Sequence, residues 1–413
     1  MKRTLLVASV LCLALTACSK ATSGDQSAGG VKTGPGVTAS TIRLGSLVDL
    51  TAVFAPLSKS VVQGTQLYWK QQNAAGGVCG RTVEVTVKDH AYDPQKAVSV
   101  YREISGDVLG MQTVLGSPVV SALRATIDQD GMYVGFAGWS ASALSDQHIQ
   151  VFGTTYDIEA ISGLDFLMRT KAVKSGDKIG HVYFEGDFGE NAFKGSQHLA
   201  SQSGLTIVGQ KIKPSDTDLS AQVSAFRSAG VKAILVSAGP TQTASVAGVA
   251  KSVGLDVPIA ANGPGFTPQL LDSPAGPALK ENLYVVSSIA PPALDAPAAK
   301  QLQDAFSKEY PDAVPTQVGS VFGYVQARVT KDVLQKACDN KDLTRQGVIT
   351  ALHQISGLDT GGLIAGTLDY TKSGQPPSRS VYIARVDAGV PGGLKVVEGP
   401  TEAAPAKSYQ PTA

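Results

Sequence analysis

Residues 42–48, IRLGSLV, form an apolar run of strand length, and the pattern that decides the fold begins there. A stretch with helical periodicity follows at 61–73, and Gly76-Gly77 ends it. Residues 83–87, VEVTV, then alternate apolar and polar side chains, which predicts a second strand. A strand, a helix and a strand in this order predict parallel pairing with the helix packed on the sheet.

The same alternation continues along most of the chain. Further helices are expected at 94–104, 119–130, 191–202, 219–228 and 243–251, and further strands at 113–115, 179–184, 206–208, 233–236 and 257–261. Near residue 153 the first series ends and a second, similar series starts. The sequence therefore predicts an α/β protein of two doubly wound parallel-sheet lobes. In such folds ligands bind at the carboxyl ends of the strands, which here face the cleft between the lobes.

The N-terminus predicts export. Lys2 and Arg3 precede a short apolar stretch at 5–15, so residues 1–17 have the pattern of a secretory signal peptide. Residues 15–18, LTAC, resemble the bacterial lipobox, which implies cleavage before Cys18 and acylation of its sulfur. A plain secreted protein in which Cys18 is incidental is the alternative. Residues 18–38 are rich in Ser, Gly, Ala and Thr, so we expect a lipidated flexible linker that holds an extracytoplasmic protein to the membrane.

Composition limits the partners of this chain. Its 413 residues carry a net charge of +1, so no large field of one sign is available to attract nucleic acid. Hydrophobic residues make up 43% and charged residues 17%, as in a globular protein with a sizeable core. After the first few residues no apolar run approaches the roughly 20 residues that a spanning helix needs. We expect two folded domains and no nucleic-acid partner.

Enzyme signatures are weak. Residues 138–142, GWSAS, approach the nucleophile-elbow pattern around Ser140, but a serine stands where the second glycine would relieve crowding. The five histidines are scattered, and none has a second ligand at metal-site spacing. Glycine-rich stretches such as 263–265 lack the spacing of a phosphate-binding loop. We therefore expect no catalytic residue, no metal and no cofactor, with a serine hydrolase using Ser140 as the alternative.

Five short motifs resemble the leucine/isoleucine/valine-binding family of type I periplasmic binding proteins. They occur in family order between about residues 41 and 388, at 42–49, 73–81 (NAAGGVCGR), 89–98 (DHAYDPQKAV), 184–189 (FEGDFG) and 252–255 (SVGL). The resemblance implies three hinge crossings, near residues 153, 287 and 366. Lobe 1 would then comprise 39–153 and 288–366, lobe 2 would comprise 154–287 and 367–400, and residues 401–413 would form a C-terminal tail.

Two cysteines remain outside the N-terminal segment. In an oxidising compartment we expect Cys79 and Cys338 to form a disulfide, and two unpaired buried thiols are the alternative. The connectivity implied by the family resemblance returns Cys338 to the lobe that holds Cys79, which makes the bridge geometrically conceivable.

The resemblance also implies ligand contacts at the strand ends. The helix start at Ser117 would offer free N–H groups to an anionic ligand group, and Trp139 and Phe188 would contribute aromatic faces. The full set of expected contacts is Phe54, Ser117, Val119, Val120, Trp139, Ser140, Asp187, Phe188, Pro240, Thr241, Asn262 and Phe266.

The function implied by the resemblance is capture of a small organic solute by lobe closure and its delivery to the permease subunits of an ABC importer, by a monomer. A ligand sensor for a membrane receptor is a further alternative. The family pattern places an acidic residue in the second lobe to pair with an ammonium group, whereas residues 260–266, AANGPGF, hold no carboxylate. A free branched-chain amino acid is therefore not expected, unless Glu185 or Asp187 substitutes. A neutral or anionic ligand with an apolar or aromatic body fits better.

Overall fold

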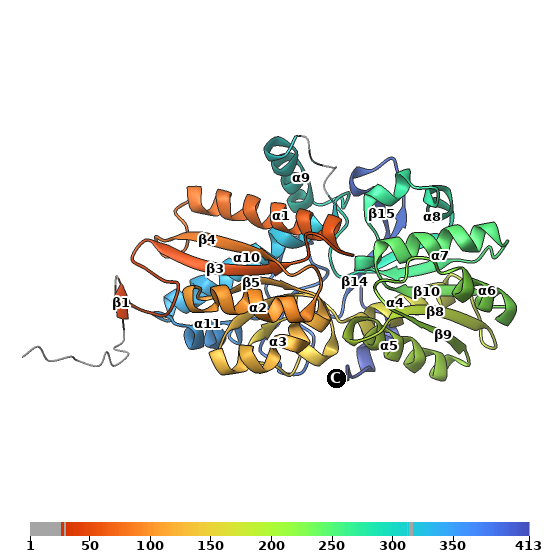
Figure 1. The fold of residues 1–413 in the computed structure, drawn as a ribbon, viewed down its shortest axis with the longest axis horizontal. Helices are drawn as coiled ribbons and strands as arrows, with labels where there is room; N and C mark the ends of the chain where they lie inside the picture. Colours follow the sequence, from red (N-terminus) through yellow and green to blue (C-terminus); the bar gives the residue numbers. More distant parts are fainter. Residues whose placement is uncertain (1–25, 29, 312, 314–316, 413) are drawn as a thin grey trace, which may run out of the picture.

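The computed structural model describes residues 26–28, 30–311, 313 and 317–412, which form two α/β lobes lying side by side (Figure 1). The expected signal peptide and Cys18 lie outside the described residues. Within the described part of the chain, no helix is long and apolar enough to cross a membrane.

Lobe 1 is built on a five-stranded sheet with the order β4-β3-β5-β6-β7, and every neighbouring pair is parallel. The strands are β3 (Thr41–Val48), β4 (Thr82–Asp89), β5 (Gly110–Leu115), β6 (Tyr133–Ala137) and β7 (Ile149–Gln150). The helices of this lobe are α1 (Ala55–Ala74), α2 (Pro94–Ile104), α3 (Ser117–Asp130), α9 (Pro297–Glu309), α10 (Val318–Asp339) and α11 (Arg345–Leu352).

Helices cover both faces of this sheet. Leu47 packs in one apolar cluster with residues of α2 and α3, whereas its neighbour Val48 packs in another with residues of α1 and α10. Successive side chains of a strand point to opposite faces, so both faces must be apolar. This explains why every residue of β5 and β6 is buried. Continuous apolar runs, rather than alternation, are the sequence signature of such strands.

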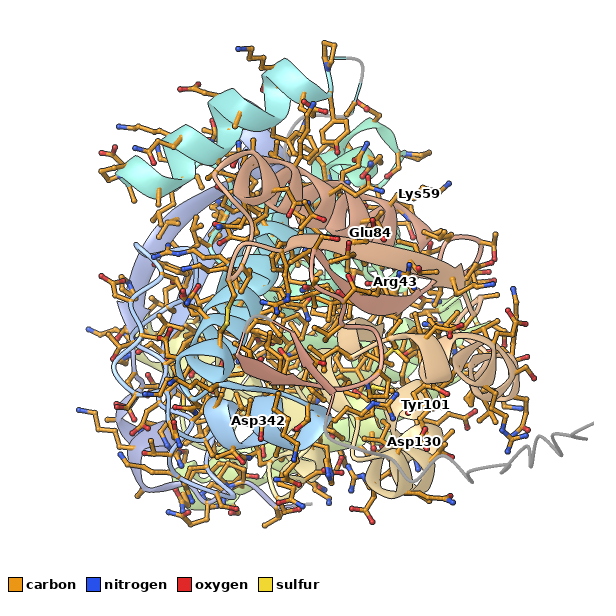
Figure 2. The ribbon with its side chains drawn as sticks, turned by 90° about the vertical axis from the view of Figure 1, so that its left-hand side faces the viewer. Arg43, Lys59, Glu84, Tyr101, Asp130 and Asp342 are labelled. Atoms are coloured by element: carbon orange, nitrogen blue, oxygen red, sulfur yellow. A yellow bond between two sulfur atoms is a disulfide. The ribbon has the colours of Figure 1, made fainter. Side chains whose placement is uncertain are left out.

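Polar contacts mark the outer edge of lobe 1 (Figure 2). Arg43 on β3 faces Glu84 on β4 across the strand pair, 3.7 Å from it, and both side chains are largely exposed. The Tyr101 hydroxyl on α2 donates to Asp130 at the end of α3 over 2.9 Å. The sulfurs of Cys79 and Cys338 are joined in a disulfide, with Cα atoms 6.5 Å apart. This bridge ties the loop after α1 to the end of α10.

Lobe 2 is built on a seven-stranded sheet with the order β15-β14-β12-β11-β10-β8-β9. The strands are β8 (Lys178–Phe184), β9 (Thr206–Ile212), β10 (Ala233–Ser237), β11 (Ile259–Asn262), β12 (Leu283–Ser287), β14 (Val381–Val386) and β15 (Leu394–Thr401). The helices are α4 (Tyr156–Arg169), α5 (Asp187–Ser203), α6 (Ser220–Ala229), α7 (Pro240–Ser252), α8 (Gly276–Asn282) and α12 (Ala404–Ser408).

The strands from β8 to β12 pair in parallel, as the alternation with helices predicts. The last two strands are antiparallel additions at one edge, β14 on β12 and β15 on β14. The short connection from Asp387 to Gly393 allows only a hairpin, because a parallel pair needs a crossover of a dozen or more residues. The prediction of parallel-sheet lobes is confirmed, with this edge hairpin as the departure.

The chain passes between the lobes three times, as expected for the fold class. The crossings lie between β7 and α4, between β12 and α9, and between α11 and β14. Two of the crossing segments pair directly, since the Ala365 N–H donates to the Ser288 carbonyl over 2.8 Å. Gly153 lies against them with φ of 101°, and a Cβ at this position would overlap the Ser288 side chain. Glycine is therefore required at the first crossing.

Both terminal segments make contacts with the lobes. β2 (Val31–Thr33) pairs with β1 (Gln26–Ala28) and with β13 (Asp342–Leu343), so these residues of the expected linker belong to a small sheet on lobe 1. At the other end α12 contacts α4, and Tyr409 is buried. Part of the expected C-terminal tail therefore packs on lobe 2.

Candidate ligand-binding cleft

A cavity lies between the lobes at the carboxyl ends of their strands, where a doubly wound fold places its ligands. The space between its lining atoms is about 630 Å³, part of it open to solvent. Its lining is mainly apolar and aromatic and consists of Phe54, Leu57, Val61, Tyr92, Leu115, Gly116, Ser117, Ala137, Trp139, Tyr156, Glu159, Phe188, Gly263, Pro264, Ser287, Ile289, Val318, Gly319 and Phe322.

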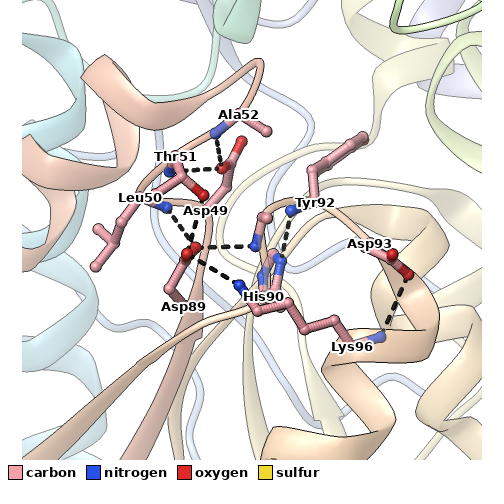
Figure 3. A network of polar contacts seen from close by, with 10 residues as sticks. Asp49, Leu50, Thr51, Ala52, Asp89, His90, Tyr92, Asp93 and Lys96 are labelled. Carbon is pink, nitrogen blue, oxygen red and sulfur yellow. Dashed lines mark hydrogen bonds and ion pairs between the residues drawn. The ribbon is translucent and has the colours of Figure 1, made fainter.

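Two aspartates of lobe 1 hold the loop that carries Phe54 (Figure 3). The buried Asp49 carboxylate accepts the backbone N–H of Ala52 over 2.6 Å and that of Phe54 over 2.8 Å. Asp89 accepts the Leu50 N–H over 2.9 Å. Burial opposes ionisation of Asp89, but the backbone N–H groups of Leu50 and Ala91, together with Thr51 and Lys96, hold the pKa of this carboxyl well below its usual value. Both acids therefore act as fixed acceptors for this loop.

The neighbouring loop presents Tyr92 to the cavity. Ala91 and Tyr92 both have positive φ, 51° and 56°, and the Tyr92 N–H donates to His90 Nδ1 over 2.9 Å. This turn brings the Tyr92 ring edge-on to Phe54, with ring centroids 4.9 Å apart. A Cβ on Gly116 would lie 2.6 Å from the Tyr92 ring. The aromatic end of the cavity is thus held by the hydrogen bonds of the two loops.

The start of α3 presents hydrogen-bonding groups to the cavity. Ser117 is buried and lines the cavity, and its Oγ makes no hydrogen bond of ordinary geometry within the described residues. The helix follows Gly116, so no side chain caps its N-terminus. The first N–H groups of a helix lack partners inside the helix and carry partial positive charge. An acceptor group of a ligand is favoured at this position.

An aromatic wall crosses from one lobe to the other. The Trp139 ring lies 5.1 Å from Phe322 and 5.8 Å from Tyr156, measured between centroids, and Tyr156 lies 4.3 Å from Phe188. Trp139 Nε1 donates to the Phe152 carbonyl over 2.6 Å. Burial raises the pKa of the Tyr156 phenol well above its usual value, and the nearby Tyr92 and Glu159 raise it further. Tyr156 therefore remains a neutral hydroxyl.

Among the described residues that line the cavity, Glu159 is the one acidic side chain, and none is Lys, Arg or His. Its Oε2 accepts from Asn262 Nδ2 over 2.8 Å, and its Oε1 accepts the Ser288 N–H over 3.2 Å. Burial raises the pKa of Glu159 to about 8, against the opposing effect of these hydrogen bonds. The cavity thus contains a carboxyl group that is mostly protonated at neutral pH.

The structure brings four of the twelve expected contacts to the cavity, namely Phe54, Ser117, Trp139 and Phe188. Val119 and Val120 face the apolar cluster between α2, α3 and the sheet, because only the first residue of the helix reaches the cleft. Phe266 is buried in the core beside Gly393, and Asn262 contacts Glu159. Pro240 and Thr241 start α7 outside the lining.

Ser140 and Asp187 join the lobes beside the cavity. Ser142 Oγ donates to Asp187 Oδ2 over 3.2 Å, and Ser140 Oγ lies 3.1 Å from Ser142 Oγ and 3.5 Å from the Asp187 carbonyl oxygen. Among the described residues, no histidine is hydrogen-bonded to Ser140. A serine nucleophile needs an adjacent general base, so the geometry gives no support to a hydrolase.

The cavity also contains residues that the sequence reasoning did not select, above all Tyr92, Tyr156, Glu159 and Phe322. Tyr92 lies inside the DHAYDP motif, so that motif was a usable signal. Glu159 is one turn into the helix that follows the first crossing. Phe322 lies in the first turns of α10, which enters the site only through the return of the chain to lobe 1.

Two α/β lobes joined by three crossings around a mainly apolar cavity define a two-lobed solute-binding protein. The comparison with known families agrees: residues 41–391 match the periplasmic binding protein family, and the chain belongs to it. The prediction of a type I periplasmic binding protein related to the leucine/isoleucine/valine-binding proteins is thereby confirmed.

Individual relatives extend this assignment. The chain is 25% identical to a Leu/Ile/Val-binding protein homolog 8 of Brucella abortus over 47% of its own length and 51% of that protein, about half of the relative. It is 22% identical to the Leu/Ile/Val-binding protein BraC3 of Rhizobium johnstonii over 84% of this chain and 92% of that protein.

Among solved structures, a fatty acid ABC transporter substrate-binding protein from Thermomonospora curvata is 46% identical, with a TM-score of 0.90 over 93% of this chain and 98% of that chain. A branched-chain amino acid ABC transporter protein from Thermus thermophilus with bound valine shares the fold, at 19% identity and a TM-score of 0.79, over 89% of this chain and 98% of that chain.

Proposed function

We propose that this chain is the extracytoplasmic solute-binding component of an ABC importer and that its solute is a carboxylic acid with an apolar body, such as a fatty acid. The observation that carries the proposal is the cavity, in which apolar and aromatic walls surround the start of α3 and a buried carboxyl group. The 46% identical protein from Thermomonospora curvata, described as a fatty acid binder, supports the same solute class.

A free amino acid fits this cavity less well. An ammonium group buried away from water needs an ionised partner, and none is present at 260–266. Residues 260–266 hold no carboxylate, as noted from the sequence, but the lining includes Glu159 from α4. Burial nevertheless favours the neutral form of Glu159. Glu185 is exposed and Asp187 bonds to the opposite lobe, so neither lies in the lining.

The remaining steps of the proposed function follow from the architecture. Closure of the lobes around the solute would create the surface that docks on permease subunits. Acylation of Cys18 would keep the protein, as a monomer, at the outer face of the membrane. Binding and release require no covalent chemistry, so we propose no enzymatic activity.

The test is calorimetry with octanoate, decanoate and palmitate beside leucine, isoleucine and valine. We expect micromolar binding of the fatty acids and none of the amino acids, because only the former match an apolar cavity without an ionised acid. Thr241→Ala, an exposed position at the start of α7 outside the cavity, serves as the control and should bind as the parent does. Micromolar binding of leucine with no binding of any fatty acid would contradict the proposed solute class.

A further inference from the structure

Glu159 stands at one end of a buried chain of hydrogen bonds in lobe 2. Asn262, whose Nδ2 donates to Glu159, accepts from Ser237 Oγ over 2.6 Å. Ser237 Oγ lies 2.9 Å from His181 Nε2, and His181 Nδ1 lies 2.8 Å from Ser196 Oγ. Burial lowers the pKa of His181 to about 3, so this ring is neutral and supplies no positive charge. This chain of hydrogen bonds positions the Glu159 carboxyl but supplies no positive charge to pair with it.

Among the residues that the structure describes, no Lys, Arg or His forms an ion pair with Glu159 or lines its cavity. Asp157 on α4 is a second buried acid, and burial raises its pKa as well. The phenols of Tyr156 and Tyr92 line the same cavity, and burial keeps both neutral. From β11 and the segment after β12 come Asn262 and the Ser288 N–H, and α5 contributes Phe188 to the same cavity. An ionised Glu159 would face a ligand carboxylate with no positive charge between the two groups.

Polar groups of both lobes line the cavity. Ser117 comes from lobe 1, and Tyr156 and Glu159 come from lobe 2. Each Glu159 oxygen already accepts one hydrogen bond from the protein. The proton of the neutral acid is therefore the only donor that this side chain can present to a ligand. Two carboxyl groups at close range hold one proton between them, because both cannot ionise side by side.

We propose that Glu159 recognises the carboxyl group of the solute by sharing a single proton with it, while Ser117 and the start of α3 bind the second ligand oxygen. This inference rests on the proposed function, since it requires a carboxylate ligand. It assigns Glu159 as the residue that selects acids over ammonium-bearing amino acids. The polar chain through Asn262, Ser237 and His181 positions it.

The pH dependence of binding follows from the pKa of Glu159, which burial raises to about 8. Below this pH the free protein already holds the proton, so affinity for a carboxylate should be constant. Above it the complex must take up a proton from solution, so affinity should fall by up to about tenfold for each pH unit. An ionised Glu159 paired with an ammonium would give the opposite slope in the same range.

The experiment is calorimetry of octanoate binding from about pH 6.5 to about pH 9.5, repeated in buffers of different ionisation enthalpy to count the protons bound. We expect a flat dissociation constant up to about pH 8, a rise of up to about tenfold per unit above it, and uptake approaching one proton. Glu159→Gln keeps a donor but has no proton to lose, so it should bind octanoate with a flat profile over the whole range.

The outcomes separate the two proposals. Octanoate binding by the unmodified protein with a flat profile and no proton uptake would overturn the role of Glu159 and leave the fatty-acid function standing. Failure of every fatty acid to bind at any pH would overturn the function itself. The proton count on the unmodified protein keeps the inference testable even if Glu159→Gln does not fold, which circular dichroism would reveal.

Discussion

Among single residues of the cleft, Trp139 is both held by a hydrogen bond and part of the cavity lining. Its indole N–H is committed to the Phe152 carbonyl, which fixes the ring, while the ring itself lines the cavity. A fixed aromatic ring adds contact area at little entropic cost, which is why tryptophan often dominates binding energy. The second tryptophan, Trp69, is buried in lobe 1, where its Nε1 donates to Gln112 over 3.1 Å.

Trp139 should report and support ligand binding. In a Trp69→Phe background all indole fluorescence comes from Trp139, and it should change on saturation with octanoate, because the ligand replaces water at the ring. Trp139→Ala should weaken octanoate binding by about 2 kcal/mol, the loss typical of a buried aromatic hot spot. Trp69→Phe alone is the matched control and should leave the affinity unchanged. An unaltered spectrum on saturation would place Trp139 outside ligand contact.

Between elements, α1 and α10 pack closely, although 258 residues separate Thr65 of α1 from Gly323 of α10 in the chain. A Cβ on Gly64 of α1 would overlap the Ser320 carbonyl of α10, and a Cβ on Gly323 of α10 would overlap the Val61 carbonyl of α1. Thr65 Oγ1 also donates to the Gly323 carbonyl over 3.2 Å. The helices can approach this closely only because both contact positions lack side chains. The pair carries Leu57, Val61 and Phe322 into the cavity.

Gly323→Ala should therefore destabilise lobe 1. The added methyl group has backbone on its far side and no room to shift, so the helices must separate, at a cost of about 1–3 kcal/mol. Chemical denaturation followed by circular dichroism measures the loss. The control is Gly106→Ala, at a position where a Cβ would meet no atom within 4 Å. Equal stability of both variants would show that the helix contact tolerates a side chain.

The fold could be predicted from the sequence more fully than the cavity lining could. The alternation of strands and helices is local, so 42–48 and 83–87 were sufficient to identify the first parallel unit. The site was predicted less fully, because Phe322 and Glu159 reach the cavity through contacts between distant segments that no local pattern records. Val119 and Val120 were assigned by position next to Ser117, but helical geometry turns their side chains into the core.

At the scale of the whole molecule, the lobes are in contact on one side of the cavity. The Ala141 N–H of lobe 1 lies 3.3 Å from Asn191 Oδ1, which also accepts the Asp157 N–H of lobe 2 over 3.3 Å. Ser142 Oγ adds a hydrogen bond to Asp187 Oδ2 in the same lobe-to-lobe contact. Phe54 and Phe184 meet edge-on across the cleft, with centroids 6.5 Å apart. These contacts exist only when the lobes are close together, so they bias the protein toward closure.

Ser142→Ala should shift this balance toward an open form. The variant loses the hydrogen bond to Asp187 but leaves the cavity lining intact, because Ser142 is not part of it. One such bond contributes about 1 kcal/mol, and the apparent affinity falls in proportion to the closed fraction, so octanoate binding should weaken by up to about fivefold. Small-angle scattering of the ligand-free variant should show a larger radius of gyration, while its denaturation midpoint should match that of the parent.

Ser145→Ala, an exposed serine of the same segment, is the control. If Ser142→Ala binds octanoate as tightly as Ser145→Ala does, the bond to Asp187 does not contribute to closure.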